Sequence, residues 1–293
     1  MARLPTIAAR AEALLEMAVV ATTPVAGGSI CTATRLRLAD GGSAFVKTRA
    51  NAPADFFTSE ARGLDWLRSS TGVPVPDVLA VSDDCLILTW IPTGYPSADA
   101  AENFARQLAA THAIGAEHFG SDRNGYIGTV PLLNEPTDTW TQFWATRRVL
   151  PYLHAAADQG VLSPHDAGLV EQVVDRIDEL AGDPEPPSRV HGDLWSGNIV
   201  WGGDGVAHLV DPAAHGGHRE SDLAVLALFG APHLERILDA YDESASLPDG
   251  WRARMALHQL HPLLVHALHF GGSYGARAGA AASSLLHGIA ARR

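Results

Sequence analysis

The chain has 293 residues, which is enough for one large domain or two smaller ones with a sizeable apolar core. Apolar residues make up 46% of the chain and charged residues 18%, and no uncharged apolar run is long enough to span a membrane, so the composition excludes a disordered chain and predicts a globular protein. The net charge of −12 at pH 7 argues against binding to nucleic acid or to an anionic membrane surface.

The first third of the chain carries strand signals. The expected elements are, in chain order, strands over residues 29–38 and 43–48, a helix over 53–67, and strands over 78–81 and 86–91. Asp40-Gly41 lies between the first two strands and suits a hairpin turn, so these strands should pair antiparallel. This part predicts a small antiparallel sheet with one long helix.

Beyond residue 97 the apolar residues follow the 3.6-residue period of helices. Helices are expected over residues 98–113, 139–159, 164–181, 221–229, 233–241 and 251–270. Two short strands, 199–201 and 206–210, interrupt them and are joined by a glycine-rich turn. The chain crosses between the two parts at Pro92-Thr93-Gly94, so the sequence predicts an α+β fold with lobes over residues 1–92 and 93–293. A cleft between unlike lobes is a usual place for a ligand.

The strongest chemical signal lies just before the short strand hairpin. His191, Asp193 and Asn198 form the pattern H-x-D-x-x-x-x-N, and Asp211 follows the second strand of the hairpin. Because a hairpin returns the chain to its starting end, Asn198 and Asp211 should lie side by side. Oxygen ligands of this kind suit Mg²⁺ bound together with substrate phosphates. This is the layout of phosphoryl transfer, with Asp193 as the base and Asn198 and Asp211 as metal ligands.

Lys47 is the single lysine among 21 cationic residues, which suggests a position where a planar guanidinium would not serve. It ends the strand segment Ala44-Phe45-Val46-Lys47, which is similar to the V-A-I-K strand of kinases. Glu60 on the following helix would be its partner. An ammonium held in this way could orient the α- and β-phosphates of a nucleotide.

Other segments carry weaker signals. Gly27-Gly28-Ser29 precedes a strand and could present backbone N–H groups to phosphates, although it lacks the G-x-G-x-x-G pattern. Trp195 is either a packing anchor or an apolar wall for a sugar ring. His215 and His218 follow Asp211 in a glycine-containing segment, where they could meet a substrate or simply pack.

The cysteines and the first residues of the chain bear on the cellular compartment. Cys31 and Cys85 lie far apart and neither belongs to a CxxC pair, which argues against a disulfide framework and a structural zinc site. The first eighteen residues contain acidic side chains and lack a cleavable apolar core, so no secretory signal is expected. The default expectation is a cytoplasmic enzyme.

Longer stretches of the chain resemble the fructosamine kinase (ketosamine kinase) family. The string HGDLWSGN at His191–Asn198 is more specific to this family than the general kinase pattern. The other matching segments span nearly the whole chain and lie at residues 119–120, 124–128, 140–147, 211–213, 217–224, 228–230, 258–264 and 270–274. The resemblance implies a protein-kinase-like fold that uses ATP and Mg²⁺ to phosphorylate a sugar hydroxyl of an amine-linked ketose, a route to deglycation.

The resemblance also implies roles for single residues. Asp193 would be the catalytic base, Asn198 and Asp211 would hold the metal, and Lys47 with Glu60 would position phosphates.

Further roles concern support and the nucleotide base. His191 and Asp222 would brace the catalytic loop, and Thr89-Trp90-Ile91 at the lobe crossing would bind adenine through its backbone. Three departures from the family stand out: Thr89 replaces a frequent Glu, and His215-Gly216 and Ser221 replace aromatic residues. The last two lie where the acceptor would dock, so the acceptor is the least defined part of the expectation.

Two alternatives remain open from the sequence. An aminoglycoside- or choline-type phosphotransferase shares the Asp, Asn and Asp set, and a pseudokinase would bind nucleotide without turnover. Loss of Lys47, Asp193 or Asp211 would favour the pseudokinase, and all three are present. The sequence predicts a small sugar amine as the substrate and leaves the oligomeric state open.

Overall fold

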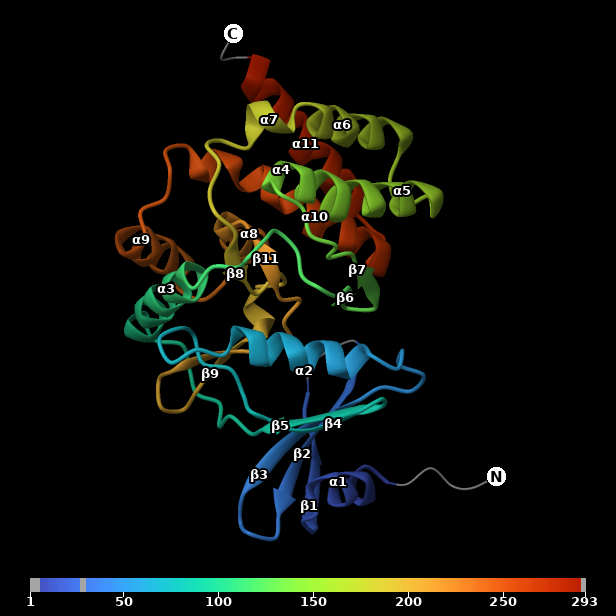
Figure 1. Ribbon diagram of the computed structural model, residues 1–293, viewed down its shortest axis with the longest axis vertical. Helices are drawn as coiled ribbons and strands as arrows, with labels where there is room; N and C mark the ends of the chain where they lie inside the picture. Colours follow the sequence, from blue (N-terminus) through green and yellow to red (C-terminus); the bar gives the residue numbers. More distant parts are fainter. Residues whose placement is uncertain (1–5, 27–29, 291–293) are drawn as a thin grey trace.

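The computed structural model describes residues 6–26 and 30–290, and its N-terminal part is built on one antiparallel sheet (Figure 1). The sheet has the strand order β1-β2-β3-β5-β4. Its elements are α1 (Ile7–Leu15), β1 (Val19–Pro24), β2 (Thr32–Leu38), β3 (Ser43–Thr48), α2 (Phe56–Leu67), β4 (Val78–Ser82) and β5 (Cys85–Thr89). The expected β2–β3 hairpin is confirmed, and the Asp40 carboxylate caps its turn by accepting a hydrogen bond from the Gly42 N–H at 2.8 Å.

The two helices of this part pack on opposite faces of the sheet. Successive residues of a strand point to opposite faces. Val46 and Ile87, which pair across β3 and β5, pack with Ala11 of α1. The next pair, Lys47 and Leu86, therefore faces α2, which lies between the sheet and the helical lobe (Figure 1). This alternation is what directs the single lysine toward α2.

The rest of the chain is mostly helical, as the sequence predicts. Its helices are α3 (Ala98–Ala113), α4 (Trp140–Phe143), α5 (Leu150–Asp158), α6 (Pro164–Asp175), α7 (Ile177–Leu180), α8 (Arg219–Phe229), α9 (Leu234–Ser244), α10 (Trp251–Phe270) and α11 (Tyr274–Ala290). Three two-stranded ladders join them: β6 (Gly125–Ile127) with β7 (Val130–Leu132), β8 (Ser188–Val190) with β11 (His215–Gly217), and β9 (Ile199–Trp201) with β10 (Ala207–Leu209). The two-lobed α+β prediction is confirmed. Among the described residues, no helix is both long and apolar enough to cross a membrane.

The helix expected over residues 139–159 is interrupted. Between α4 and α5 the chain forms a wider turn over Trp144–Val149, in which hydrogen bonds join residues five apart. Pro151 stands at the start of α5 and lacks the N–H that a regular helix would need there. The apolar period continues through this segment, so periodicity alone does not reveal the change.

The hairpin β9–β10 is hydrogen-bonded directly to the crossing between the lobes. The Gly94 N–H donates to the Trp201 carbonyl at 2.7 Å, and the Gly203 N–H donates to the Pro92 carbonyl at 2.8 Å. A Cβ atom on Gly94 would lie 2.7 Å from the Gly202 carbonyl oxygen, so this close approach requires glycine. The crossing therefore holds the hairpin in a fixed place relative to the sheet.

Candidate active site

The loop from His191 to Asn198 connects β8 to β9, and its backbone is hydrogen-bonded to Asp222 of α8. The two Asp222 carboxylate oxygens accept the His191 and Gly192 backbone N–H groups at 2.7 and 2.9 Å. His112 of α3 lies 3.1 Å from the same carboxylate. Burial alone would raise the pKa of Asp222, but the hydrogen bond and charge of His112 outweigh it and lower the pKa. Asp222 is therefore an ionised anchor for the backbone of the loop.

The His191 side chain links the loop to the end of β10. Its Nε2 donates to the Val210 carbonyl at 2.8 Å, and its Nδ1 accepts from the Asp193 N–H at 3.3 Å. Burial lowers the pKa of His191, which favours the neutral ring that this pair of bonds requires. The imidazole thus connects the residue before Asp211 to the backbone of Asp193.

Asn198 lies against Asp193 and beside the strand that leads to Asp211. Its Nδ2 donates to the Asp193 carbonyl at 2.8 Å and to the Asp193 Oδ2 at 3.3 Å. The Val210 N–H donates to the Asn198 carbonyl at 3.1 Å, so the hairpin places Asn198 opposite the residue that precedes Asp211. Burial, followed by the charge of the Asp211 carboxylate, raises the pKa of Asp193 to about 7. A carboxyl group tuned toward neutral pH is suited to accept a proton.

Lys47 joins the two lobes through its ammonium group. The Nζ atom lies 2.9 and 2.8 Å from the two carboxylate oxygens of Glu60 and 2.8 Å from Oδ1 of Asp211. Burial opposes the charged ammonium, but the Glu60 and Asp211 carboxylates outweigh it and raise the pKa of Lys47. Only 7% of Lys47 is exposed, which fits a compact ammonium better than a guanidinium.

Asn198 and Asp211 each have a side-chain oxygen atom that could bind a hard divalent cation. Among the described residues, no hydrogen bond occupies Oδ1 of Asn198 or Oδ2 of Asp211. Asp211 has a φ of +54°, a left-handed conformation that is unfavourable for a residue with a side chain. Amide and carboxylate oxygens are ligands that Mg²⁺ accepts. Asn198 and Asp211 could therefore hold Mg²⁺ beside the Lys47 ammonium group, which bonds the other oxygen of Asp211.

The segment expected to bind adenine directly follows β5. Thr89 is tied to Asp77, whose carbonyl accepts the Thr89 N–H and whose N–H donates to the Thr89 Oγ1, both at 3.0 Å. The Arg35 guanidinium lies 4.7 Å from the centre of the Trp90 ring. Thr89, Trp90 and Ile91 are each half-buried at the lobe crossing.

The glycine loop Gly27-Gly28-Ser29 lies outside the described residues. The residue after it, Ile30, approaches the helical lobe at the β6–β7 turn, because a Cβ on Gly128 would lie 3.0 Å from Ile30 and 2.6 Å from His269 Nε2. Sequence reasoning missed this hairpin. Its strands have three residues each, too few to show an alternating pattern, and the glycine-containing segment at 124–128 was the only signal.

The three residues considered for the acceptor lie in different surroundings. Trp195 is 42% exposed, and its ring lies against Gly197, where a Cβ would come within 2.1 Å of the ring. His215 and His218 are buried, at 7% and 4% exposure. His215 Nδ1 donates to the Ala213 carbonyl at 2.8 Å, and His218 Nδ1 accepts from the Glu220 N–H at 3.2 Å. Only Trp195 of the three offers a broad exposed surface.

His218 also belongs to a cluster whose spacing would suit a metal. Its ligand atoms lie within 4.8 Å of those of Glu220 and His258. Both carboxylate oxygens of Glu220 already accept from Arg254, at 2.6 and 3.1 Å. Because the guanidinium satisfies the carboxylate, the cluster is a packing and charge-pairing feature of the helical lobe.

Comparisons with known proteins identify the family of the chain. The chain matches the fructosamine kinase family over residues 5–288. It is 35% identical over 256 residues to a protein of Escherichia coli named a probable ketoamine kinase, covering 85% of this chain and 86% of that protein. A crystal structure from Thermobifida fusca, assigned by name as a fructosamine-3-kinase, is 50% identical with a TM-score of 0.91, covering 96% of this chain and 99% of the other.

A more distant structure defines the fold class. Choline kinase from Streptococcus pneumoniae is 14% identical, with a TM-score of 0.59 over 96% of this chain and 98% of that chain. At this identity the likeness concerns the fold alone, and it confirms the kinase-like phosphotransferase architecture. The match over nearly the whole length and the close structural relative show that the chain belongs to the fructosamine kinase family.

Proposed function

We propose that this protein transfers the γ-phosphate of ATP, in the presence of Mg²⁺, to a sugar hydroxyl of a ketosamine. The observation that carries the proposal is the junction in which Lys47 bonds Glu60 and Asp211 while Asn198 bonds Asp193. These contacts support the proposal because a phosphate-orienting cation, two oxygen ligands and a carboxyl base would then act close together. Membership in the fructosamine kinase family supports the choice of acceptor.

Each residue of the junction has a role in the proposed reaction. Asp193 accepts the proton as the acceptor hydroxyl attacks the γ-phosphorus and ADP leaves. Lys47 orients the α- and β-phosphates, and Glu60 fixes the ammonium. Asn198 and Asp211 would hold Mg²⁺, which when bound neutralises charge on the phosphates.

Supporting residues fix the position of the base. Asp222 and His191 hold the loop backbone on both sides of Gly192, so the Asp193 carboxyl has little freedom to move away from its substrate.

The remaining assignments complete the proposal. Residues 1–92 form the nucleotide-binding lobe, and residues 93–293 carry the catalytic and acceptor groups. The backbone of Thr89-Trp90-Ile91 binds adenine, Gly27-Gly28-Ser29 covers the phosphates, and the exposed Trp195 ring forms an apolar wall for the sugar. A reaction that consumes ATP is expected in the cytoplasm.

The experiment that tests this function compares acceptors under one Mg-ATP condition. We expect ATP consumption with a fructosamine and a ribulosamine, and much lower kcat/KM with an aminoglycoside or choline. A tenfold or greater preference for choline or the aminoglycoside, about 1.4 kcal/mol in the transition state, would contradict the acceptor class and leave the kinase chemistry in place. Nucleotide binding without turnover of any acceptor would instead support the pseudokinase alternative.

A further inference from the structure

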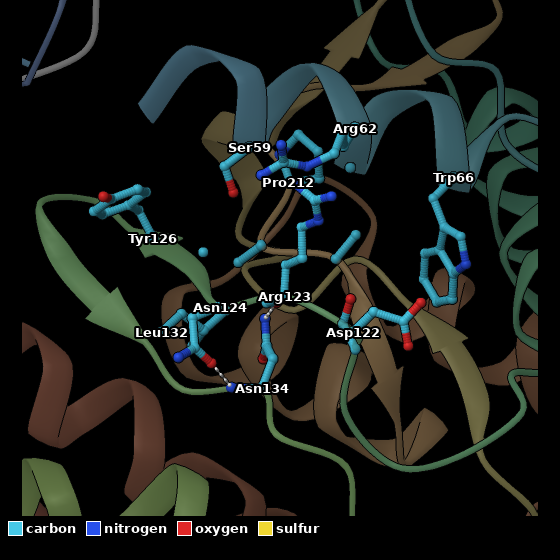
Figure 2. Close-up of a pocket in the computed structure, with 15 residues that line it drawn as sticks. Ser59, Arg62, Trp66, Asp122, Arg123, Asn124, Tyr126, Leu132, Asn134 and Pro212 are labelled. Carbon is cyan, nitrogen blue, oxygen red and sulfur yellow. Dashed lines mark hydrogen bonds between the residues drawn. The ribbon is translucent and has the colours of Figure 1, made fainter. Parts of the chain in front are cut away.

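A cavity of about 230 Å³ lies under α2, on the side of the helix that faces the helical lobe (Figure 2). Its walls come from α2, from the segment Ser121–Tyr126 that leads into β6, and from Pro212–Ala214. Pro212 packs against α2, since a Cβ on Gly63 would lie 3.2 Å from its ring. None of the residues proposed to act in phosphoryl transfer lines this cavity. It is therefore a separate feature of the fold.

Two arginines enter the cavity from opposite sides. Arg62 comes from α2 and Arg123 from the segment before β6, and Figure 2 shows both side chains pointing into the same space. Within residues 6–26 and 30–290, neither guanidinium has a hydrogen bond, an ion pair or an aromatic ring beneath it. By contrast, Arg219 and Arg254 each bind a carboxylate through two nitrogen atoms.

Two guanidinium groups that converge without a counter-ion repel one another. In a chain with a net charge of −12, many carboxylates are available, yet none closes this pair. The planar fork of arginine is suited to bind phosphate or carboxylate oxygens in pairs. The Ser59 hydroxyl lies on the same helix face, one turn before Arg62, and has no hydrogen bond to a described residue. It adds a neutral donor to the two cationic ones.

One carboxylate does line the cavity and acts against an anion. Asp122 lies next to Arg123, but its side chain is 90% exposed, and its carboxylate lies 3.7 Å from the His118 imidazole. A charge so well solvated interacts weakly with its neighbours. Asp122 should therefore lower the affinity of this cavity for an anion without preventing the anion from binding.

We propose that Arg62 and Arg123 form a binding site for a small oxyanion, a phosphate or a carboxylate, which is a ligand separate from the nucleotide and the acceptor. A bound anion bridges α2 to the helical lobe. Because α2 carries Glu60, and Pro212 follows Asp211, the anion would tie together the two sides of the Lys47 junction. The binding claim does not depend on the proposed kinase activity.

The test titrates the whole chain with inorganic phosphate and, separately, with succinate, a carboxylate that binds Mg²⁺ only weakly, by calorimetry. The protein is first saturated with Mg²⁺ and a non-hydrolysable ATP analogue, so that phosphate positions near Lys47 are filled; this step also measures nucleotide binding by itself. We expect saturable binding that becomes at least tenfold weaker in Arg62→Gln and in Arg123→Gln. Arg37→Gln is the matched control, since Arg37 is exposed on β2, and it should bind like the parent.

A further variant should change the affinity for the anion in the opposite direction. Asp122→Asn removes the solvated carboxylate and should tighten anion binding by about twofold or more, an effect that a purely structural role for this loop would not produce. The proposal is overturned if the parent protein shows no saturable binding. It is also overturned if the Arg62→Gln and Arg123→Gln variants bind the anion as tightly as the parent does.

A kinetic arm separates a free anion from a charged acceptor. We compare kcat/KM for a ketosamine of glycine, which carries a carboxylate, with that for a ketosamine that has no carboxylate. Equal effects of Arg62→Gln on the two acceptors support a separate ligand. A selective loss with the glycine derivative would show that the site holds the acceptor's own carboxylate and would overturn the claim of a separate ligand.

Discussion

The two faces of α2 differ in whether their charged side chain has a partner within the chain. Glu60 and Arg62 are two residues apart, which places their side chains about 200° apart around a helix of 3.6 residues per turn. Glu60 points to the sheet, where both of its oxygens bind Lys47. Arg62 points to the helical lobe, where no described residue binds it. One helix therefore carries a charge that the chain itself satisfies and a charge that it leaves for a ligand.

This difference predicts how each face responds to change. Breaking one partner of a buried charge pair leaves the other uncompensated, which typically costs about 3 to 5 kcal/mol. A half-exposed guanidinium can be removed at little cost in stability, and only the binding of its ligand should suffer. Substitutions on the Lys47 side should thus reduce activity or folding, and substitutions at Arg62 should reduce anion binding alone.

The largest loss of activity is expected at Asp193, which lies on the Lys47 side of the comparison. Asp193→Asn keeps the shape of the side chain but removes the group that accepts the hydroxyl proton, so turnover should fall on the order of 10² to 10⁴-fold. Affinity for ATP should stay within about threefold of the parent, because the amide can still bond Asn198. Steady-state kinetics with a nucleotide titration measure both values. A variant that turns over within about threefold of the parent would remove Asp193 from the role of base.

A smaller loss is expected from Lys47→Arg, which keeps the charge. The Lys47 ammonium bonds three carboxylate oxygens in a nearly closed space, and a guanidinium is too wide and too planar to repeat that arrangement. We expect kcat/KM for ATP to fall by at least about tenfold. The reverse exchange Arg37→Lys serves as the control and should leave the value unchanged. Normal turnover by Lys47→Arg would mean that the single lysine is an accident of composition.

Asp222→Asn tests the support beneath the catalytic loop. The new amide would present N–H groups or one oxygen where two backbone N–H donors and His112 now meet a carboxylate. Hydrogen bonds to a charged group contribute about 1.5 to 3 kcal/mol, so the free energy of unfolding should fall by about 2 kcal/mol. Urea unfolding measures this change. We also expect a lower kcat with little change in KM for ATP, whereas an unaltered kcat would show that the loop holds its position without Asp222.

The sequence alone predicts the parts of the structure that depend on local patterns. The apolar period gives α3 and α10 with the observed bounds, because both helices bury one continuous face. The hairpin argument predicts that Asn198 and Asp211 lie side by side, and in the structure the Val210 N–H, one residue before Asp211, donates to the Asn198 carbonyl. The Lys47 and Glu60 pair follows from a strand and a helix that are adjacent in the sequence and pack on each other.

Features that depend on tertiary packing are not visible in the sequence. His215 and His218 follow Asp211 in a glycine-containing segment, which suggests access to substrate, yet β11 carries the chain into the helical lobe and both rings are buried. Arg62 and Arg123 lie far apart in the chain, and each alone resembles an ordinary surface arginine. Their common cavity arises only because the β6 segment folds under α2, and no local pattern records that contact.

The last prediction concerns a buried neutral group and the dependence of stability on pH. His261 of α10 is buried, with its Nδ1 donating to the Arg148 carbonyl at 2.8 Å, and burial followed by the charge of Arg148 lowers its pKa from 6.5 to about 3. Between these two values the unfolded chain binds a proton that the folded protein does not, so stability is full above about pH 6.5 and is lost as the pH falls. One such histidine contributes a slope of up to about 1.4 kcal/mol per pH unit. His218, whose pKa burial also lowers to about 3, adds a slope of the same sign. The raised pKa of Asp193 gives the opposite sign below about pH 7 and offsets one of them.

His261→Asn should therefore flatten the dependence of unfolding free energy on pH, even though the variant is less stable near neutral pH. The shorter amide can still donate to the Arg148 carbonyl but has no proton to gain in acid. Urea unfolding at about pH 7 and about pH 5 should show the difference between the two conditions shrinking by up to about 2 kcal/mol relative to the parent. His154 is exposed on α5, so His154→Asn should leave that difference unchanged. If both variants keep the parent's pH dependence, the buried neutral ring of His261 is not what limits stability in acid.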